Sequence, residues 1–563
     1  MFLKKMNCRG YRYYSLVKGF RKDSTIKQET VYYIGDLTKL SQQKIGQIEQ
    51  VILNKGDKDL LRKFRHELYL EGVKVPTYTL DDFKIEEVLD YGDIVTQHKI
   101  FETLNIREII NKHTTKGGGV VDVGSLVEIM AINRNSEPLS RNSLHSWYES
   151  TVLPLLLKVK PECINKDVLL RALRYLQPEN TIPIQKEIYD NIKLKFGVKT
   201  EKVYYDLTSS YFEGSTCIIG KRGHSRDHRP DKSQIVIGIV VNQDGILITH
   251  SVYEGNTTDV TTIDATITTL KTQFEVDKCL IIADRGLISA KNVGLIESKE
   301  YSYILANKRN KTEKNLIIRS KEECVWKNID ETTKLAEIIV ENKKYVLLFN
   351  EQMNWDNYMN RVKKLSKAEE RLNKVYNSIK RGKIKDLNDL IKKTDRKLVS
   401  TETTNYYDLE YTENPLSFTY SLNIENLKEA AKYDGYAIFS TNEIELHVDE
   451  VLKIYTQRDI VEKAIRTIKS VIDLRPIYVY KEEAVRGHVF ICALSYQIRS
   501  VMNYILKDNK IEMSIDEAFH ILKKLKVVNI ILQEDITIVQ RAVSTHKGSE
   551  QLIEIFNIEK DIL

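Results

Sequence analysis

The stretch from Lys202 to Ala306 restricts the possible fold of this chain more than any other part of the sequence. Apolar and β-branched runs predict strands, and longer segments with a 3.6-residue period predict helices between them. The expected strands are 202–209, 234–241, 246–253, 279–283 and 301–306, and the expected helices are 259–274 and 289–299. The first three strands follow one another through short connections, which is typical of an antiparallel meander. The order β-β-β-α-β-α-β therefore predicts an α/β fold with a mixed sheet flanked by helices.

Two aspartates occupy distinctive places in this predicted sheet. Asp206 lies within the first strand, and Asp284 directly follows the apolar run Cys279–Ala283, which reads as a buried central strand. If these strands are neighbours, the two carboxylates meet at one edge, as metal ligands in phosphoryl-transfer sites do. Taken alone, an aspartate at a strand end is more often a turn or capping residue.

A third carboxylate lies in a predicted helix from Asp449 to Val471, which contains neither proline nor glycine. At about 100° per residue, four polar side chains share one arc of about 60°. They are Tyr455, Arg458, Glu462 and Lys469, and the adjacent apolar stripe is Ile454, Val461, Ile465, Ile468 and Ile472. One carboxylate between cations suits a metal ligand beside a phosphate backbone. An ordinary solvated helix with i,i+4 ion pairs explains the same pattern.

The N-terminal segment predicts a β-hairpin with strands at Tyr11–Val17 and Thr30–Ile34, joined by the basic stretch Lys18–Lys27. Helices are expected at Leu40–Leu53, with Ser41 as N-cap, and at Leu60–Tyr69. A basic, tyrosine-rich hairpin can bind DNA phosphates, and a small capping sheet is the alternative. Residues 80–112 and 120–176 read as mostly helical, with breaks at Pro154 and Pro161.

An insertion is expected between Ala306 and Leu446. Leu316–Ile318 and Tyr345–Phe349 read as strands, and Val362–Lys397 as a charged, solvated helical hairpin. Residues 406–420 return to strand, and the strand near 436–440 should rejoin the main sheet.

Composition excludes several classes of protein. The 563 residues carry a net charge of +7, which is compatible with a polyanionic partner. Six scattered cysteines form no CxxC pair, so neither a zinc site nor a disulfide framework is indicated, and a reducing cytoplasm is expected. No signal peptide and no membrane span are expected.

The chain resembles bacterial insertion-sequence transposases of the DDE type, in the subgroup with a Tyr-x2-Arg-x3-Glu-x6-Lys signature. Tyr455, Arg458, Glu462 and Lys469 match every position of that signature. Further matching stretches are Tyr205–Thr208, Ala283–Gly286, Leu474–Ile477 and Gly223–Pro230, so the resemblance spans roughly residues 200–500. It implies a ribonuclease-H-like core that is interrupted by a β-rich insertion.

The resemblance also implies a chemistry. Asp206, Asp284 and Glu462 would bind two Mg²⁺ ions, for which Mn²⁺ would substitute, and the ions would serve DNA cleavage and strand transfer. Tyr455, Arg458, Lys469 and Arg285 would contact DNA. The implied partners are double-stranded DNA, as terminal inverted repeats and as target, and a second copy of the chain in a homodimer. Trp326 and Trp355 both lie in the insertion, where relatives stack a flipped base on a tryptophan, and no motif selects one of them.

Five parts of the chain are expected. They are an N-terminal DNA-binding module (1–75), a helical connecting domain (76–198), the catalytic core (199–308 and 446–505), the insertion domain (309–445) and a helical tail (506–563). Alternative functions are a ribonuclease-H-like nuclease such as a junction resolvase, a catalytically silent DNA-binding derivative of a transposase, and a structural protein. The large insertion argues against a compact resolvase, and the presence of all three carboxylates argues against a silent derivative.

Overall fold

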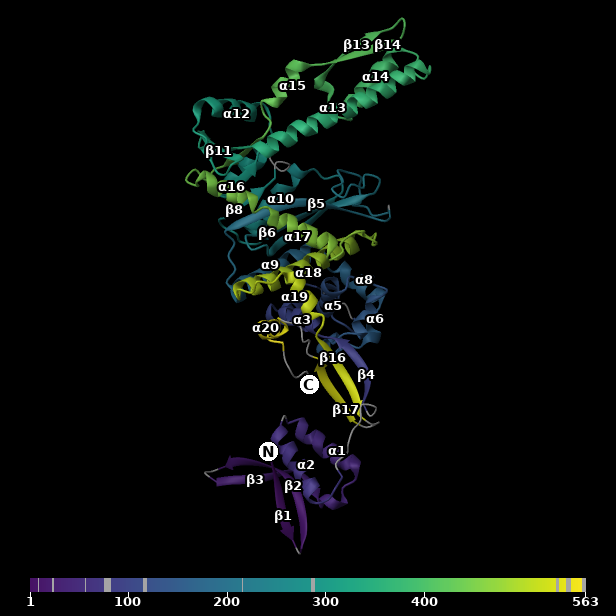
Figure 1. Cartoon of the computed structure of the whole chain (residues 1–563), viewed down its shortest axis with the longest axis vertical. Helices are drawn as coiled ribbons and strands as arrows, with labels where there is room; N and C mark the ends of the chain where they lie inside the picture. Colours follow the sequence, from purple (N-terminus) through teal and green to yellow (C-terminus); the bar gives the residue numbers. More distant parts are fainter. Residues whose placement is uncertain are drawn as a thin grey trace. The chain divides into compact units, whose positions relative to one another are not determined.

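The computed structural model describes residues 1–558 apart from 9, 23–24, 56, 75–82, 115–118, 215, 285–288, 533–535 and 543–547 (Figure 1). The chain divides into two compact units. The first consists of residues 1–96, 146–158 and 516–563, and the second of residues 97–145 and 159–515.

The first unit begins with a three-stranded antiparallel sheet and two helices. The elements are β1 (Phe2–Cys8), β2 (Tyr11–Lys22), β3 (Thr25–Gly35), α1 (Gln42–Leu53) and α2 (Lys58–Leu70). The predicted hairpin is present as β2 and β3, but β1 was not predicted, because apolar and polar side chains do not alternate along it. Tyr14 and Leu16 pack against Phe64 in a shared core. Ser41 caps α1 as expected, since its hydroxyl accepts a hydrogen bond from Lys44 N at 3.3 Å.

The rest of the first unit contains a second three-stranded sheet, in which β4 (Phe83–Asp90) pairs with β16 (Lys526–Leu532) and β16 with β17 (Ile536–Ala542). The prediction of a mostly helical segment at 80–112 is therefore wrong for β4, and residues 80–82 lie outside the described residues. Pairing with a strand more than 400 residues away decides the conformation of β4, and local periodicity carries no signal of it. Short helices accompany this sheet: α6 (Leu144–Glu149), α7 (Leu153–Leu157), α19 (Ile515–Leu522) and α20 (Ser549–Ile555).

Helices dominate the first part of the second unit, as predicted. They are α3 (Gly92–Thr103), of which residues 97–103 belong to this unit, α4 (Ile106–His113), α5 (Val123–Ser136), α8 (Lys166–Arg174) and α9 (Pro178–Phe196). A later helix, α18 (Glu482–Asp508), packs against α5 and α8. By length and composition α18 could cross a membrane, but 83% of its most apolar window is buried inside the protein. Gly487 permits the contact with α8, because a Cβ there would lie 2.3 Å from the Leu173 carbonyl oxygen.

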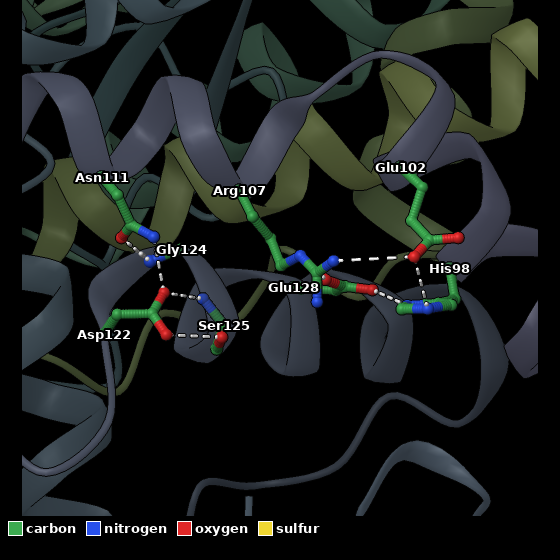
Figure 2. Close-up of polar contacts among 8 residues, drawn as sticks. All are labelled: His98, Glu102, Arg107, Asn111, Asp122, Gly124, Ser125 and Glu128. Carbon is green, nitrogen blue, oxygen red and sulfur yellow. Dashed lines mark hydrogen bonds and ion pairs between the residues drawn. The ribbon is translucent and has the colours of Figure 1, made fainter. Parts of the chain in front are cut away.

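A buried polar network joins α3, α4 and α5 (Figure 2). Glu128 is fully buried and its Oε1 lies 2.6 Å from His98 Nδ1, while its Oε2 lies 3.4 Å from Arg107 Nε without a hydrogen bond. Nearby, Asp122 caps α5 and accepts hydrogen bonds from Ser125 N at 2.8 Å and from Asn111 Nδ2 at 2.7 Å. A buried polar or charged group is costly unless it has a partner, and here the partners come from neighbouring helices. The contacts therefore hold α3, α4 and α5 together.

The central sheet confirms the predicted order of elements. Its core elements are β5 (Lys202–Tyr211), β6 (Gln234–Asn242), β7 (Leu247–Glu254), α10 (Asp259–Thr272), β8 (Leu280–Ala283), α11 (Ala290–Ser298) and β9 (Ser302–Ala306). Strands β5, β6 and β7 are antiparallel, whereas β8 runs parallel to both β5 and β9. The spatial order β7-β6-β5-β8-β9 is that of the expected ribonuclease-H-like sheet.

The insertion extends this sheet rather than leaving it. Strands β10 (Lys327–Asn328), β11 (Thr333–Val340), β12 (Lys343–Asn350) and β15 (Tyr436–Thr441) continue it beyond β9 in the order β10-β11-β12-β15-β9. The expectation that the strand near 436–440 rejoins the main sheet is thus confirmed. Leu316–Ile318 is not a strand but part of α12 (Lys311–Glu323), which Asn310 caps and in which two of the three apolar side chains are buried.

The predicted charged hairpin is α13 (Glu351–Lys380) with α14 (Leu387–Val399), two helices that lie side by side (Figure 1). It is followed by β13 (Tyr407–Thr412), β14 (Ser417–Leu422) and α15 (Ile424–Ala431). This part has its own apolar core, which includes Leu372, Leu390 and Phe418. The assignment of residues 309–445 to a separate domain, like the other domain boundaries, remains a prediction.

Candidate active site

Adjacent parallel strands bring the first two aspartates to one edge of the sheet. In the pairing of β5 with β8, Tyr205 lies opposite Ala283, so Asp206 and Asp284 follow at the same level. The Asp206 side chain is 23% exposed and that of Asp284 is 41% exposed. Burial raises the pKa of Asp206 to about 6, although a backbone hydrogen bond from Leu207 and the charge of Arg458 act to lower it.

The helix predicted at 449–471 is broken into two helices. They are α16 (Val448–Thr456) and α17 (Asp459–Ser470), and Gln457 and Arg458 lie between them. The link uses i→i+3 hydrogen bonds, from Arg458 N to Tyr455 O at 3.0 Å and from Ile460 N to Gln457 O at 3.0 Å. The phenol of Tyr204 on β5 also donates to Gln457 Oε1 at 3.2 Å. The prediction of one unbroken helix over 449–471 is therefore wrong.

The apolar side of this segment agrees with the prediction. Val461, Ile468 and Ile472 are buried, and α17 packs on β5 and β6. Packing of this stripe on the sheet directs the opposite, polar face of α17 away from the core, and Glu462 is 45% exposed there.

Arg458 connects all three carboxylates. Its Nη2 donates to Glu462 Oε1 at 2.6 Å, and its Nη1 lies 4.0 Å from Asp206 Oδ2 and 3.9 Å from Asp284 Oδ2. The guanidinium is only 17% exposed, so it neutralises much of the negative charge in a partly dehydrated place. Within the described ranges there is no group of three or more acidic, histidine or cysteine side chains arranged to hold a metal ion. The carboxylates surround one cation, and their role as metal ligands remains a prediction.

Tyr455 lies at the same centre. Its phenol donates to Asp284 Oδ1 at 3.4 Å, and its ring packs on Phe439 of β15 with centroids 4.5 Å apart. The Arg458 guanidinium lies 5.7 Å from the centre of the Tyr455 ring. The structure thus places three of the four signature residues together: Tyr455, Arg458 and Glu462.

The fourth signature residue has a different environment. The Lys469 side chain is 9% exposed, and its Nζ donates to Asp227 Oδ1 at 2.6 Å. Asp227 is 1% exposed and also pairs with Arg475. Sequence reasoning did not single out Asp227, although it lies within the matched stretch Gly223–Pro230. The predicted contact of Lys469 with DNA remains a prediction, while the structure shows a buried ion pair.

Comparison with protein families identifies the family of this chain. A family model described as the transposase DDE domain matches residues 205–498, slightly more than half of the chain, and includes all three carboxylates. The chain is a DDE transposase. Residues 3–60 match the N-terminal domain of IS1634 family transposases, so the protein belongs to an insertion sequence.

Comparisons with curated proteins and with solved structures do not refine the family assignment. No curated protein matches the chain. Among solved structures, the piggyBac transposase in a synaptic complex with hairpin DNA matches with a TM-score of 0.35 and 11% identity, over 77% of this chain and 79% of that one. The family assignment makes the protein a DNA transposase, an enzyme of the nuclease and transposase class whose family uses divalent metal ions.

Three further residues of the transposase were considered in the sequence as possible contacts with DNA. Arg285 lies outside the described residues, so its predicted contact with DNA remains a prediction. Trp326 is packed, with Nε1 donating to Ser320 O at 3.0 Å and its ring 5.9 Å from that of Tyr436. Trp355, on α13, is 58% exposed.

Proposed function

We propose that this transposase hydrolyses the phosphodiester at the ends of its element and joins the freed 3′-hydroxyl to target DNA. Asp206, Asp284 and Glu462 would hold two Mg²⁺ ions, for which Mn²⁺ substitutes. One observation supports this most strongly: Asp206 on β5, Asp284 directly after β8 and Glu462 on α17, far apart in sequence, present their carboxylates to the same guanidinium.

The proposal that these side chains bind a divalent ion rests on their chemistry. Three carboxylates supply the hard oxygen donors that Mg²⁺ prefers, and Asp284 and Glu462 are partly exposed to solvent. When bound, such ions activate the attacking oxygen and stabilise the leaving oxygen of an in-line displacement. Arg458 supplies positive charge at the same place, and Tyr455 offers a hydroxyl for a flanking phosphate. Arg285 and Lys469 are the further predicted DNA contacts.

The remaining roles follow from the family and from the N-terminal module. We infer that residues 1–75 bind the terminal inverted repeats, because this module carries a basic hairpin. A homodimer would hold two element ends and the target DNA together. The site of action would be the nucleoid in a bacterial cytoplasm.

A plasmid carrying the gene with its native flanking DNA tests the proposed chemistry. With Mg²⁺ the wild type should cut at both borders of the element and form joined products. Asp206→Asn, Asp284→Asn and Glu462→Gln should each abolish cutting, whereas Asp264→Asn, at an exposed site on α10, should not. Cutting without joined products would favour a simple nuclease, and full activity of any active-site variant would overturn the assignment of that residue.

A further inference from the structure

A cavity of about 750 Å³ opens in the second unit, outside the carboxylate site. It is lined by residues of α5, α8 and the start of α18, and by the loops at 138–142 and 473–481. Five cationic side chains line it against two carboxylates, those of Asp167 and Asp473. The cations are Arg134, Arg141, Lys166, Arg174 and Lys481. Such an excess of positive charge in a concave site favours an anionic ligand.

The two arginines that are half-buried have little compensation from the protein. Arg134 donates to Asp473 O at 3.3 Å and lies 3.9 Å from the Asp473 carboxylate, which is 54% exposed. Arg141 makes no hydrogen bond or ion pair anywhere in the described part of the chain. Burial, and then the charge of Arg134, lower the pKa of Arg141 to about 10. A cation kept in such a place at a cost to stability requires a functional explanation.

Around these arginines the cavity carries further side chains of the kinds that bind the phosphate backbone of DNA. Lys166, Arg174 and Lys481 are exposed, as are Tyr478 and Tyr480, at 76% and 60%. Lysine, arginine and tyrosine side chains are common donors to DNA phosphates. His488 adds no charge, because burial and the nearby Arg134 and Arg141 hold its pKa well below 6.5.

The location agrees with a DNA strand that continues past the cleavage site. The loop at 473–481 follows α17, and α17 extends eight residues beyond Glu462, or about 12 Å. At about 3.4 Å per phosphate along one strand, that length corresponds to three or four nucleotides.

We propose that this cavity binds the phosphodiester backbone of DNA beyond the cleavage point, with Arg141 and Lys481 as phosphate contacts. The inference rests on the proposed action on DNA and assigns the chain a further DNA-binding site, separate from the three carboxylates and from the N-terminal module. The site recognises charge and not sequence, so it suits flanking DNA of any composition.

Binding can be measured by fluorescence anisotropy on the full chain, in EDTA, with a duplex copied from the DNA at the element border. Arg141→Gln and Lys481→Gln should each weaken binding several-fold and lower the slope of log K against log salt by about one unit. The matched control is Lys195→Gln, an exposed lysine on α9, which should leave the slope unchanged. Arg141→Gln removes an unpaired cation, so it should not reduce thermal stability, which separates lost binding from misfolding.

The outcomes are distinct. Wild-type slopes in both cavity variants, with normal wild-type binding, would overturn this inference and leave the proposed function standing. Failure of the wild type to bind the border duplex would overturn both. Inorganic phosphate, tested by thermal shift, is the second arm: protection that Arg141→Gln abolishes, together with unchanged DNA binding, would mean that the cavity binds a free phosphate and not DNA.

Discussion

Replacing Lys469 by methionine should destabilise the second unit, because the change leaves a buried carboxylate short of one partner. Methionine keeps an unbranched apolar side chain, so the loss is mainly of charge. Breaking a buried ion pair from one side costs about 3–5 kcal/mol. Asp227 keeps Arg475, and a hydrogen bond to a charged group contributes about 1.5–3 kcal/mol, so we expect a loss of about 2 kcal/mol.

Urea unfolding of the full chain, with a double-mutant cycle, measures this interaction. The cycle combines Lys469→Met with Asp227→Asn and should give a coupling energy above about 1 kcal/mol. The matched control is the pair Lys463–Asp459 on the same helix, with Nζ to Oδ2 at 2.7 Å and side chains 67% and 52% exposed. Lys463→Met with Asp459→Asn should couple by only about 0.3–0.5 kcal/mol.

The alternative for Lys469 is a phosphate contact, as the signature implies. In that case Lys469→Met would leave the urea midpoint almost unchanged and lower the salt slope of DNA binding by about one unit. A coupling energy no larger than that of the exposed control pair, together with this loss of slope, would refute the structural role.

Further changes test other parts of the chain. Lys18→Gln with Lys27→Gln, both exposed on the N-terminal hairpin, should lower the salt slope of binding to border DNA by about two units, whereas Lys44→Gln with Lys63→Gln in the same module should not. Gly487→Ala should lower the free energy of unfolding in urea by about 1–3 kcal/mol or more, because the added Cβ would collide with the Leu173 carbonyl oxygen. The control is Gly294→Ala, at an exposed helical site with open space, which should raise the free energy of unfolding by about 0.5–1 kcal/mol. Burial acts to raise the pKa of Asp122, but hydrogen bonds from Ser125 and Asn111 outweigh it and hold that pKa below 3.8. The capping stability is therefore present above the unfolded pKa and lost as pH falls through the folded pKa. Asp122→Ala should cost about 1 kcal/mol at pH 7 and progressively less in acid, while Asp122→Asn should lose the part of this stability that depends on the charge and should remove its pH dependence.

The central sheet was predictable because its signals are local. Residues 279–283 are apolar throughout, as a strand buried on both faces requires, and the turn at Asn242–Gly245 marks a hairpin between two β-branched runs. The order of strands allowed Asp206 and Asp284 to lie side by side, and the pairing of β5 with β8 confirms that the two strands are neighbours. The same local reading succeeded for α1, where Ser41 precedes an amphipathic run.

The errors arose where distant segments decide the structure. Strand β4 depends on β16, and the N-terminal edge strand β1 carries no alternation of its own. Between α16 and α17 no proline or glycine marks the break, and the contact from Tyr204 to Gln457 that accompanies it comes from another strand. Periodicity describes one helix at a time, so it cannot detect a tertiary contact that interrupts one.

Asp227 shows how these distant contacts support the active site. Its buried carboxylate receives Lys469 from the last turn of α17 and Arg475 from the loop that follows, while Arg226 N next to it donates to Ser209 Oγ of β5 at 2.9 Å. Three matched stretches, Gly223–Pro230, α17 and Leu474–Ile477, are therefore joined through one residue. At its other end α17 begins beside Gln457, which Tyr204 holds from β5. Glu462 lies between these two attachments to the same strand, so the contacts that fix α17 also fix the distance of its carboxylate from Asp206. In this role Lys469 would position the carboxylate of Glu462, a proposed metal ligand, through its buried ion pair with Asp227.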